Sequence, residues 1–163
     1  MTKKLMIFFY ELITSLLLLL SPLVFIFRIF KKKEHIIRFK EKLCFFSKSR
    51  KKGKIIWFHC CSVGELRSVM PIINKFESRS EIKQILVTTS TLSSSLVFEQ
   101  QNLKKTIHQF FPIDNFLLTK NFVNYWKPNV AIFVESEIWP SMFYRLKKKN
   151  IPLILLNARI TKK

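Results

Sequence analysis

A nearly continuous apolar run from Leu5 to Phe30 constrains the fold of this 163-residue chain more than any other feature. Its length suffices for a helix across the hydrocarbon core of a bilayer, which needs about 20 residues. A cleaved signal peptide has a shorter apolar core and a small-residue cleavage site. We therefore predict that residues 1–30 form an uncleaved membrane anchor. Glu11, Thr14 and Ser15 interrupt the run, so a helix that lies in the membrane interface stays open as the alternative.

Basic residues follow this anchor in a dense cluster, which defines a juxtamembrane segment over residues 31–54. Their excess on the C-terminal side predicts that this side lies in the cytoplasm. Such cations suit anionic lipid head groups, although a solvated linker would carry them equally well. The formal net charge of +19 would also suit nucleic acid, but we expect no nucleic-acid partner because the cluster abuts an apolar anchor. The cluster comprises Lys31, Lys32, Lys33, Arg38, Lys40, Lys42, Lys48, Arg50, Lys51, Lys52 and Lys54.

Residues 55–163 alternate short apolar runs with segments of helical periodicity. This alternation is typical of a Rossmann-like α/β fold, in which a doubly wound parallel sheet is covered by helices on both faces. Ligands bind such sheets at the carboxyl ends of the strands, so the polar residues after each strand are the candidate site. We expect strands at residues 55–60, 85–89, 107–111, 130–134 and 153–156. We expect helices at about 66–77, 91–104, 116–125 and 138–149.

The first predicted strand is followed by Ser62, Gly64 and Glu65. Gly64 permits a tight turn. Ser62 suits the N-cap of the next helix, and Glu65 has the spacing of its capping-box partner. The same position suits catalysis, because a helix N-terminus favours the negative charge of a carboxylate. Such a carboxylate can take a proton from a hydroxyl that attacks an anomeric carbon, and the spacing alone leaves both roles open.

Hydroxyl groups lie at the end of the second predicted strand and just after it, at Thr88, Thr89 and Thr91. They can bind a phosphate or a sugar, or they can cap the next helix, which is the commoner role of such residues. Asp114, after the third strand, has the position of an N-cap for the helix that starts near residue 116.

Two carboxylates, Glu135 and Glu137, follow the fourth predicted strand. Packing does not account for charged groups at the end of an apolar strand, so they need cationic, amide or substrate partners. Arg159, after the fifth strand, is a candidate partner for these carboxylates or for an anionic group of a substrate.

Taken together, these motifs resemble those of the transferases of 3-deoxy-D-manno-octulosonic acid (Kdo), the glycosyltransferases of lipopolysaccharide synthesis. The S-V-G-E and E-S-E-I-W-P pieces are the most specific, and an N-terminal anchor also fits that family. The segments that carry the resemblance are His59–Glu65, Thr88–Thr91, Phe111–Asp114, Glu135–Pro140 and Asn157–Arg159.

The resemblance implies a GT-B fold of two Rossmann-like domains at the bacterial inner membrane, with the catalytic part on the cytoplasmic side. The N-terminal domain, here residues 55–163, would bind the acceptor, lipid A precursor, and the C-terminal domain would bind the donor, CMP-Kdo. It implies Glu65 as the general base and Glu135 as a second active-site residue. It implies no metal and no cofactor. The candidate substrate-binding residues are Ser62, Gly64, Thr88, Thr89, Thr91, Glu137 and Arg159.

Two departures from the family pattern affect these expectations. Leu92 and Ser94 stand where the family tends to have proline and glycine, which puts the geometry of that turn in doubt. The chain also stops at Lys163, before any donor-binding domain. We expect either half of a split enzyme, with a separately encoded donor domain as its partner, or an inactive membrane-bound remnant that only binds anionic lipid.

Overall fold

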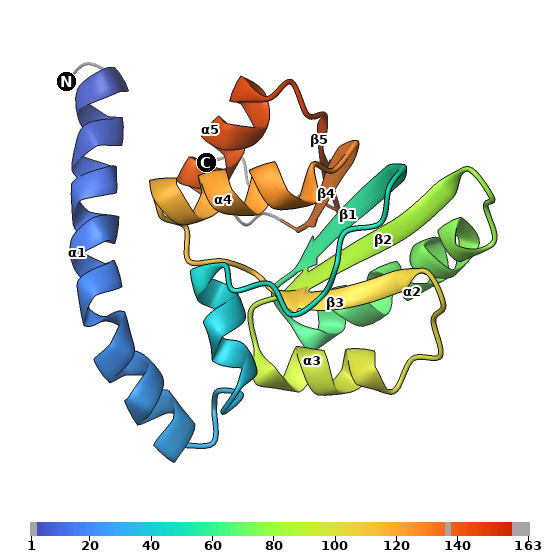
Figure 1. Cartoon of the computed structure of the whole chain (residues 1–163), viewed down its shortest axis with the longest axis horizontal. Coiled ribbons are helices and arrows are strands. Elements are labelled where there is room, and N and C mark those ends of the chain that lie inside the picture. The colour runs from blue at the N-terminus through green and yellow to red at the C-terminus, as the bar shows by residue number, and fades with distance from the viewer. Residues whose placement is uncertain (1–2, 136–137, 158–163) are drawn as a thin grey trace.

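The computed structural model describes residues 3–135 and 138–157. A long helix, α1 (Lys3–Phe30), runs along one side of an α/β domain (Figure 1). The domain contains a five-stranded sheet in the order β3-β2-β1-β4-β5, and every neighbouring pair is parallel. The Rossmann-like fold and the apolar N-terminal helix predicted from the sequence are therefore confirmed. The strands are β1 (Lys54–Cys60), β2 (Ile82–Thr89), β3 (Thr106–Phe110), β4 (Val130–Val134) and β5 (Leu153–Leu156).

β4 and β5 have the predicted limits, whereas β2 begins three residues earlier than predicted, at Ile82. The difference arises because Lys83 and Gln84 interrupt the apolar pattern. Lys83 is exposed at the sheet end, and Gln84 is buried with both ends of its amide satisfied. The Gln84 side chain accepts from the Lys51 amide at 2.9 Å and donates to the Ser49 carbonyl at 3.0 Å.

The helices of the domain are α2 (Val63–Glu77), α3 (Leu92–Glu99), α4 (Phe116–Trp126) and α5 (Pro140–Lys148). α3 was predicted to reach residue 104 but ends at Glu99. The chain leaves the helix because the backbone amide of Lys105 donates to the Glu77 carboxylate, at 3.0 and 3.2 Å, and then enters β3. α5 begins at Pro140 rather than Ile138, since proline has no amide hydrogen and suits the first turn of a helix.

α2 and α3 cover one face of the sheet, and α4 and α5 cover the other (Figure 1). Neighbouring residues of β1 point to opposite faces, as strand geometry requires. Phe58 packs in the cluster beneath α2 and α3, which includes Ile73. Trp57 packs in the cluster beneath α4 and α5, which includes Phe122 and Met142. The core therefore fixes β1 at the centre of the sheet.

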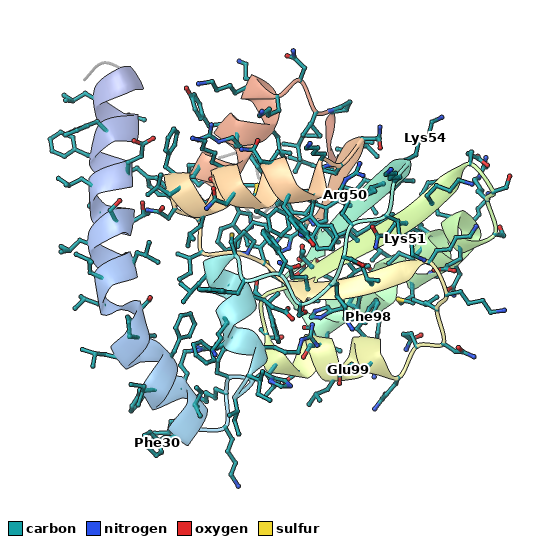
Figure 2. The ribbon with its side chains drawn as sticks, viewed as in Figure 1. Phe30, Arg50, Lys51, Lys54, Phe98 and Glu99 are labelled. Atoms are coloured by element: carbon teal, nitrogen blue, oxygen red, sulfur yellow. The ribbon has the colours of Figure 1, made fainter. Side chains whose placement is uncertain are left out.

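The basic segment 31–54 contains a short 3-10 helix, η1 (Arg38–Leu43), that contacts the edge strand β3. Glu41 accepts a hydrogen bond of 2.8 Å from the Phe110 amide. Lys42 is buried and lies 2.7 Å from Glu34, and Arg38 pairs with Glu41. Lys42 also donates to the Ser90 carbonyl at 3.2 Å, and Arg38 pairs with Glu99 of α3 at 2.8 Å, so these cations hold the segment on the domain. The cations of the segment that stay exposed are Lys31, Lys32, Lys33, Lys40, Lys48, Lys51, Lys52 and Lys54; Lys51 and Lys54 are labelled in Figure 2.

Candidate active site

The loop between β1 and α2 forms a capping box at the carboxyl end of the sheet. Ser62 is the N-cap of α2, and its Oγ accepts a hydrogen bond of 3.2 Å from the Glu65 amide. Glu65 reaches back, and its Oε2 accepts a hydrogen bond of 2.8 Å from the Cys61 amide. Its other carboxylate oxygen, Oε1, has no hydrogen-bond partner within the described ranges. The cap thus holds Glu65 in place and leaves one oxygen able to take a proton.

Gly64 lies in the first turn of α2 and is exposed. Gly64 permits a tight turn but does not adopt the left-handed geometry that favours glycine, because its φ angle lies outside that region. A Cβ atom added there would meet only the Ser62 Oγ, at 3.8 Å. The protein itself therefore has room for a side chain at this position. A requirement for glycine would come only from a ligand that approaches the loop from solvent.

Thr88, a predicted substrate-binding residue, is fully buried at the end of β2. Its Oγ1 accepts from Trp57 Nε1 at 2.8 Å and lies 3.4 Å from the Phe58 carbonyl, to which it donates. His59 Nδ1 lies 2.9 Å from the same oxygen. Because the hydroxyl has one proton, His59 Nδ1 must donate. Burial lowers the pKa of His59 to about 3, so the ring is neutral and Nε2 is free to accept from Cys61 Sγ, 3.2 Å away.

Thr89 is likewise buried, and its hydroxyl lies 2.9 Å from Nε2 of His108. Nδ1 of His108 lies 2.6 Å from Nη2 of Arg38, which can only donate, so the proton of the neutral ring is on Nε2. Burial, with the nearby Arg38 charge, lowers the pKa of His108 to about 3. Thr88 and Thr89 thus join internal networks, and their contact with substrate stays a prediction.

Thr91 is exposed and is the N-cap of α3. Its Oγ1 accepts from the Ser94 amide at 3.2 Å and lies 2.7 Å from the Ser94 hydroxyl. Ser94, which stands where the family tends to have glycine, is buried and completes this cap. The turn is therefore closed by side-chain hydrogen bonds.

β4 and β5 are each followed directly by a residue with left-handed backbone geometry. Glu135 has φ of 63° and Asn157 has φ of 58°. The Glu135 amide donates a hydrogen bond of 2.8 Å to the Leu156 carbonyl, which joins the two strand ends. Asparagine tolerates this geometry better than glutamate, so the backbone at Glu135 is strained. The predicted substrate-binding residues Glu137 and Arg159, the latter also a candidate partner of the two carboxylates, lie outside the described residues.

Asp114 is a helix cap, but of a different helix from the one predicted. Asn115 caps α4, since its Oδ1 accepts from the Leu117 amide at 2.9 Å. Asp114 instead accepts from the amides of Ser141 and Met142 in α5, at 3.0 and 2.8 Å. It also accepts a hydrogen bond of 2.7 Å from the Tyr10 hydroxyl of α1. A single carboxylate therefore links α1 to the amino end of α5.

The strand order reverses between β1 and β4, which makes this the topological switch point of the sheet. Glu65 follows β1 and Glu135 follows β4, so the two predicted active-site carboxylates flank that point. Ligands of doubly wound sheets bind at the carboxyl ends of the strands on either side of the switch point. The protein is thus a Rossmann-like α/β domain with one carboxylate residue on either side of its switch point, at the carboxyl ends of the strands.

The particular family follows from sequence comparison. Residues 37–163 match the 3-deoxy-D-manno-octulosonic-acid transferase (kdotransferase) family. Since this match covers most of the chain, the protein belongs to the Kdo transferase family.

Similar proteins occur in a plant and in bacteria. The chain is 36% identical over 163 residues to a probable mitochondrial 3-deoxy-D-manno-octulosonic acid transferase of Arabidopsis thaliana, covering 98% of this chain and 36% of that protein. It is 34% identical over 154 residues to the 3-deoxy-D-manno-octulosonic acid transferase of Rickettsia bellii, covering 94% of this chain and 37% of that protein. The chain thus spans little more than a third of the length of these relatives.

Proposed function

We propose that this chain provides the acceptor-binding domain and the general base for transfer of Kdo from CMP-Kdo to lipid A precursor. The position of Glu65 carries the proposal. It lies at the switch point of the sheet, one carboxylate oxygen is held by the Cys61 amide, and the other has no hydrogen-bond partner among the described residues. The similarity to Kdo transferases, which spans the loop that contains Glu65, supports the substrate class.

In the proposed reaction the acceptor hydroxyl oxygen attacks the anomeric carbon of Kdo. A new C–O bond forms, the bond from that carbon to the phosphate oxygen breaks, and CMP leaves with the electron pair. Glu65 takes the proton of the attacking hydroxyl, which raises the nucleophilicity of the oxygen in the transition state. The capping hydrogen bond fixes the carboxylate, because a base acts efficiently only from a defined position.

Glu135 is proposed to contribute from the opposite side of the switch point. Its left-handed backbone places a charged, exposed residue at the end of a buried strand. Strain of this kind is retained where the surrounding structure enforces it, and it clusters at functional sites. We assign Glu135 to the positioning of substrate.

The donor site is proposed to lie on a further domain, either on the same polypeptide or on a separate one. The relatives are nearly three times as long as the region matched here, which leaves room for such a domain. The exposed cations directly after α1, Lys31, Lys32 and Lys33, suit an acceptor that carries phosphates in an anionic leaflet.

The test is reconstitution of transfer. The chain is combined in vesicles with the remaining part of the Rickettsia bellii relative, lipid A precursor and CMP-Kdo, and the Kdo attached to lipid is measured by mass spectrometry. Transfer that requires both polypeptides supports the proposal. No transfer, under conditions in which the intact relative is active, contradicts it and favours a remnant that only binds lipid.

A further inference from the structure

The polar side chains of α1 form a stripe along one side of the helix. Tyr10, Thr14, Ser21 and Arg28 recur every four or seven residues, which places them within about 40° of one another around the axis. Thr14 and Ser21 are buried, and so is Phe25 beside them. This stripe faces the α/β domain.

The contacts between α1 and the domain extend along most of the helix. Near its amino end, Tyr10 donates to Asp114, and Ser15 accepts a hydrogen bond of 3.1 Å from the Asn115 side chain. Towards the carboxyl end the Phe25 ring packs on Phe39, with 5.2 Å between centroids. The last turn is held by an ion pair of 3.0 Å between Arg28 and Glu34, which is buried. α1 is therefore docked lengthwise on the domain.

The opposite side of α1 is apolar and uncovered, and the side chains drawn there are almost entirely carbon (Figure 2). Phe30 is 82% exposed at its end. Soluble proteins rarely expose an apolar surface that extends over the length of a long helix. The exposed apolar residues of α1 are Leu5, Met6, Phe8, Phe9, Leu12, Ile13, Leu16, Leu17, Leu19, Leu20, Leu23, Val24, Ile26, Phe27 and Phe30.

A helix docked in this way does not fit a crossing of the bilayer. α1 rises about 1.5 Å per residue, so Tyr10 lies about 30 Å along the axis from Phe30. That distance equals the thickness of the hydrocarbon core, about 30 Å. If Phe30 were at the near surface of the membrane, Tyr10 would be at the far surface. The part of the α/β domain that is docked on α1 between these two levels, from the Glu34 contact to the Asp114 contact, would then lie within hydrocarbon with its polar and charged groups, at a high energetic cost.

A cavity of about 470 Å³ lies between α1 and the domain, and it is suited to contact with lipid. Met6 and Tyr10 of α1 line it on one side, and Phe116, Phe143 and Tyr144 line it on the other. Its lining is mainly apolar, so acyl chains can fill the space that protein side chains leave between the helix and α5.

We propose that α1 lies in the plane of one membrane leaflet, with its polar stripe on the domain and its apolar side among the acyl chains. The occupant of the apolar face is a lipid leaflet that contains anionic head groups. Charge complementarity identifies this partner, because the chain has a net charge of +19 and Lys31, Lys32 and Lys33 are exposed directly after the helix. This placement does not rest on the proposed transferase activity, and its test does not use that activity.

Sidedness of labelling separates an in-plane helix from a crossing one. Single substitutions Lys4→Cys and Lys52→Cys are made in the full chain, and sealed vesicles of both orientations are treated with a maleimide that cannot cross membranes. Label is assigned to each peptide by mass spectrometry, so the native cysteines are counted separately. An in-plane helix gives label at both positions from the same side. Label at position 4 from the opposite side to position 52 would overturn the proposal.

Depth within the leaflet gives a second, independent measurement. Nitroxide labels are placed at Leu12, Leu19 and Leu23, which lie on the exposed apolar side, in vesicles that contain phosphatidylglycerol. An in-plane helix gives nearly equal oxygen accessibility at the three sites. A crossing helix gives depths that differ by up to about 16 Å between Leu12 and Leu23. That gradient, or failure of the chain to float with the vesicles, would contradict the in-plane placement.

Discussion

The indole of Trp57 donates a hydrogen bond of 2.8 Å to the Thr88 hydroxyl, inside the sheet and directly beneath the β1–α2 loop that carries Glu65. Thr88 Oγ1 also accepts from His59, which contacts Cys61 in that loop. A buried network of this kind is costly to leave partly unsatisfied. The hydroxyl of Thr88 therefore supports the active-site loop from below.

Removal of this hydroxyl should destabilise the domain. In Thr88→Val the buried donors of Trp57 and His59 lose their acceptor, so we expect a loss of about 1–3 kcal/mol in the free energy of unfolding. Chemical denaturation in detergent measures it. Thr88→Ser keeps the hydroxyl and is the matched control. Equal stability of the valine and serine variants would show that the network contributes little.

Stability should fall in mild acid because His59 and His108 are buried and neutral. Burial lowers both pKa values to about 3, whereas the unfolded chain has the ordinary value of 6.5. The unfolded state therefore binds more protons between pH 6.5 and pH 3, and unfolding becomes more favourable as the pH falls through this window. From pH 7 to pH 5 we expect a loss of about 2 kcal/mol for each histidine.

The measurement is the free energy of unfolding at pH 7 and at pH 5 in wild type and in His59→Gln. The variant should lose roughly half of the pH dependence that the two histidines contribute. An unchanged pH dependence would mean that His59 has the same pKa in the folded and the unfolded state.

Loss of the Tyr10 hydroxyl should loosen α1 from the domain. Tyr10→Phe removes the donor to Asp114, while the Ser141 and Met142 amides still hold the carboxylate. Trypsin cleavage at Lys31–Lys33 should become several-fold faster, because the equilibrium constant for undocking changes by about tenfold for the 1–2 kcal/mol of such a bond. Tyr144→Phe is the control, since the Tyr144 hydroxyl has no hydrogen-bond partner in the described parts of the chain. Equal cleavage rates in the two variants would argue against docking through Tyr10.

Substitution of Gly64 should separate stability from activity. Gly64→Ala meets only the Ser62 Oγ at 3.8 Å and should stabilise α2 by about 0.5–1 kcal/mol, because alanine favours helices. We still expect slower Kdo transfer in the reconstituted system, since the added methyl group lies where substrate approaches. A stable and fully active variant would remove Gly64 from the substrate-binding set.

Much of the architecture was predictable because its signals are local. The runs that form β4 and β5 are short, apolar and bounded by polar residues or proline, and their limits agree with the structure. The capping relation of Ser62 and Glu65 follows from a spacing of three residues. The end of α3 was missed because it depends on Glu77, far away in the sequence.

The site was less predictable, because its supporting contacts are long-range. Asp114 caps α5 through Ser141, 27 residues later in the sequence, and accepts a hydrogen bond from Tyr10, 104 residues earlier. No local sequence pattern predicts either contact. The burial of Thr88 follows from the sheet around it. The left-handed backbone of Glu135 depends on the end of β5 beside it. Sequence motifs identified the loops but did not reveal which hydroxyls are used internally.

The central claim is that Glu65 is the general base, and Glu65→Gln tests it most directly. The glutamine carbonyl oxygen can still accept from the Cys61 amide, so the helix cap and the fold should be retained. The amide cannot take a proton from the acceptor. The control is Glu81→Gln, at an exposed carboxylate away from the β1–α2 loop.

The decisive measurement is the initial rate of Kdo transfer by the two variants and wild type, each combined with the same donor-domain polypeptide. We expect Glu65→Gln to be at least about 100-fold slower than wild type at an unchanged unfolding temperature, and Glu81→Gln to equal wild type. A Glu65→Gln rate close to that of wild type would contradict the assignment of Glu65 as the base.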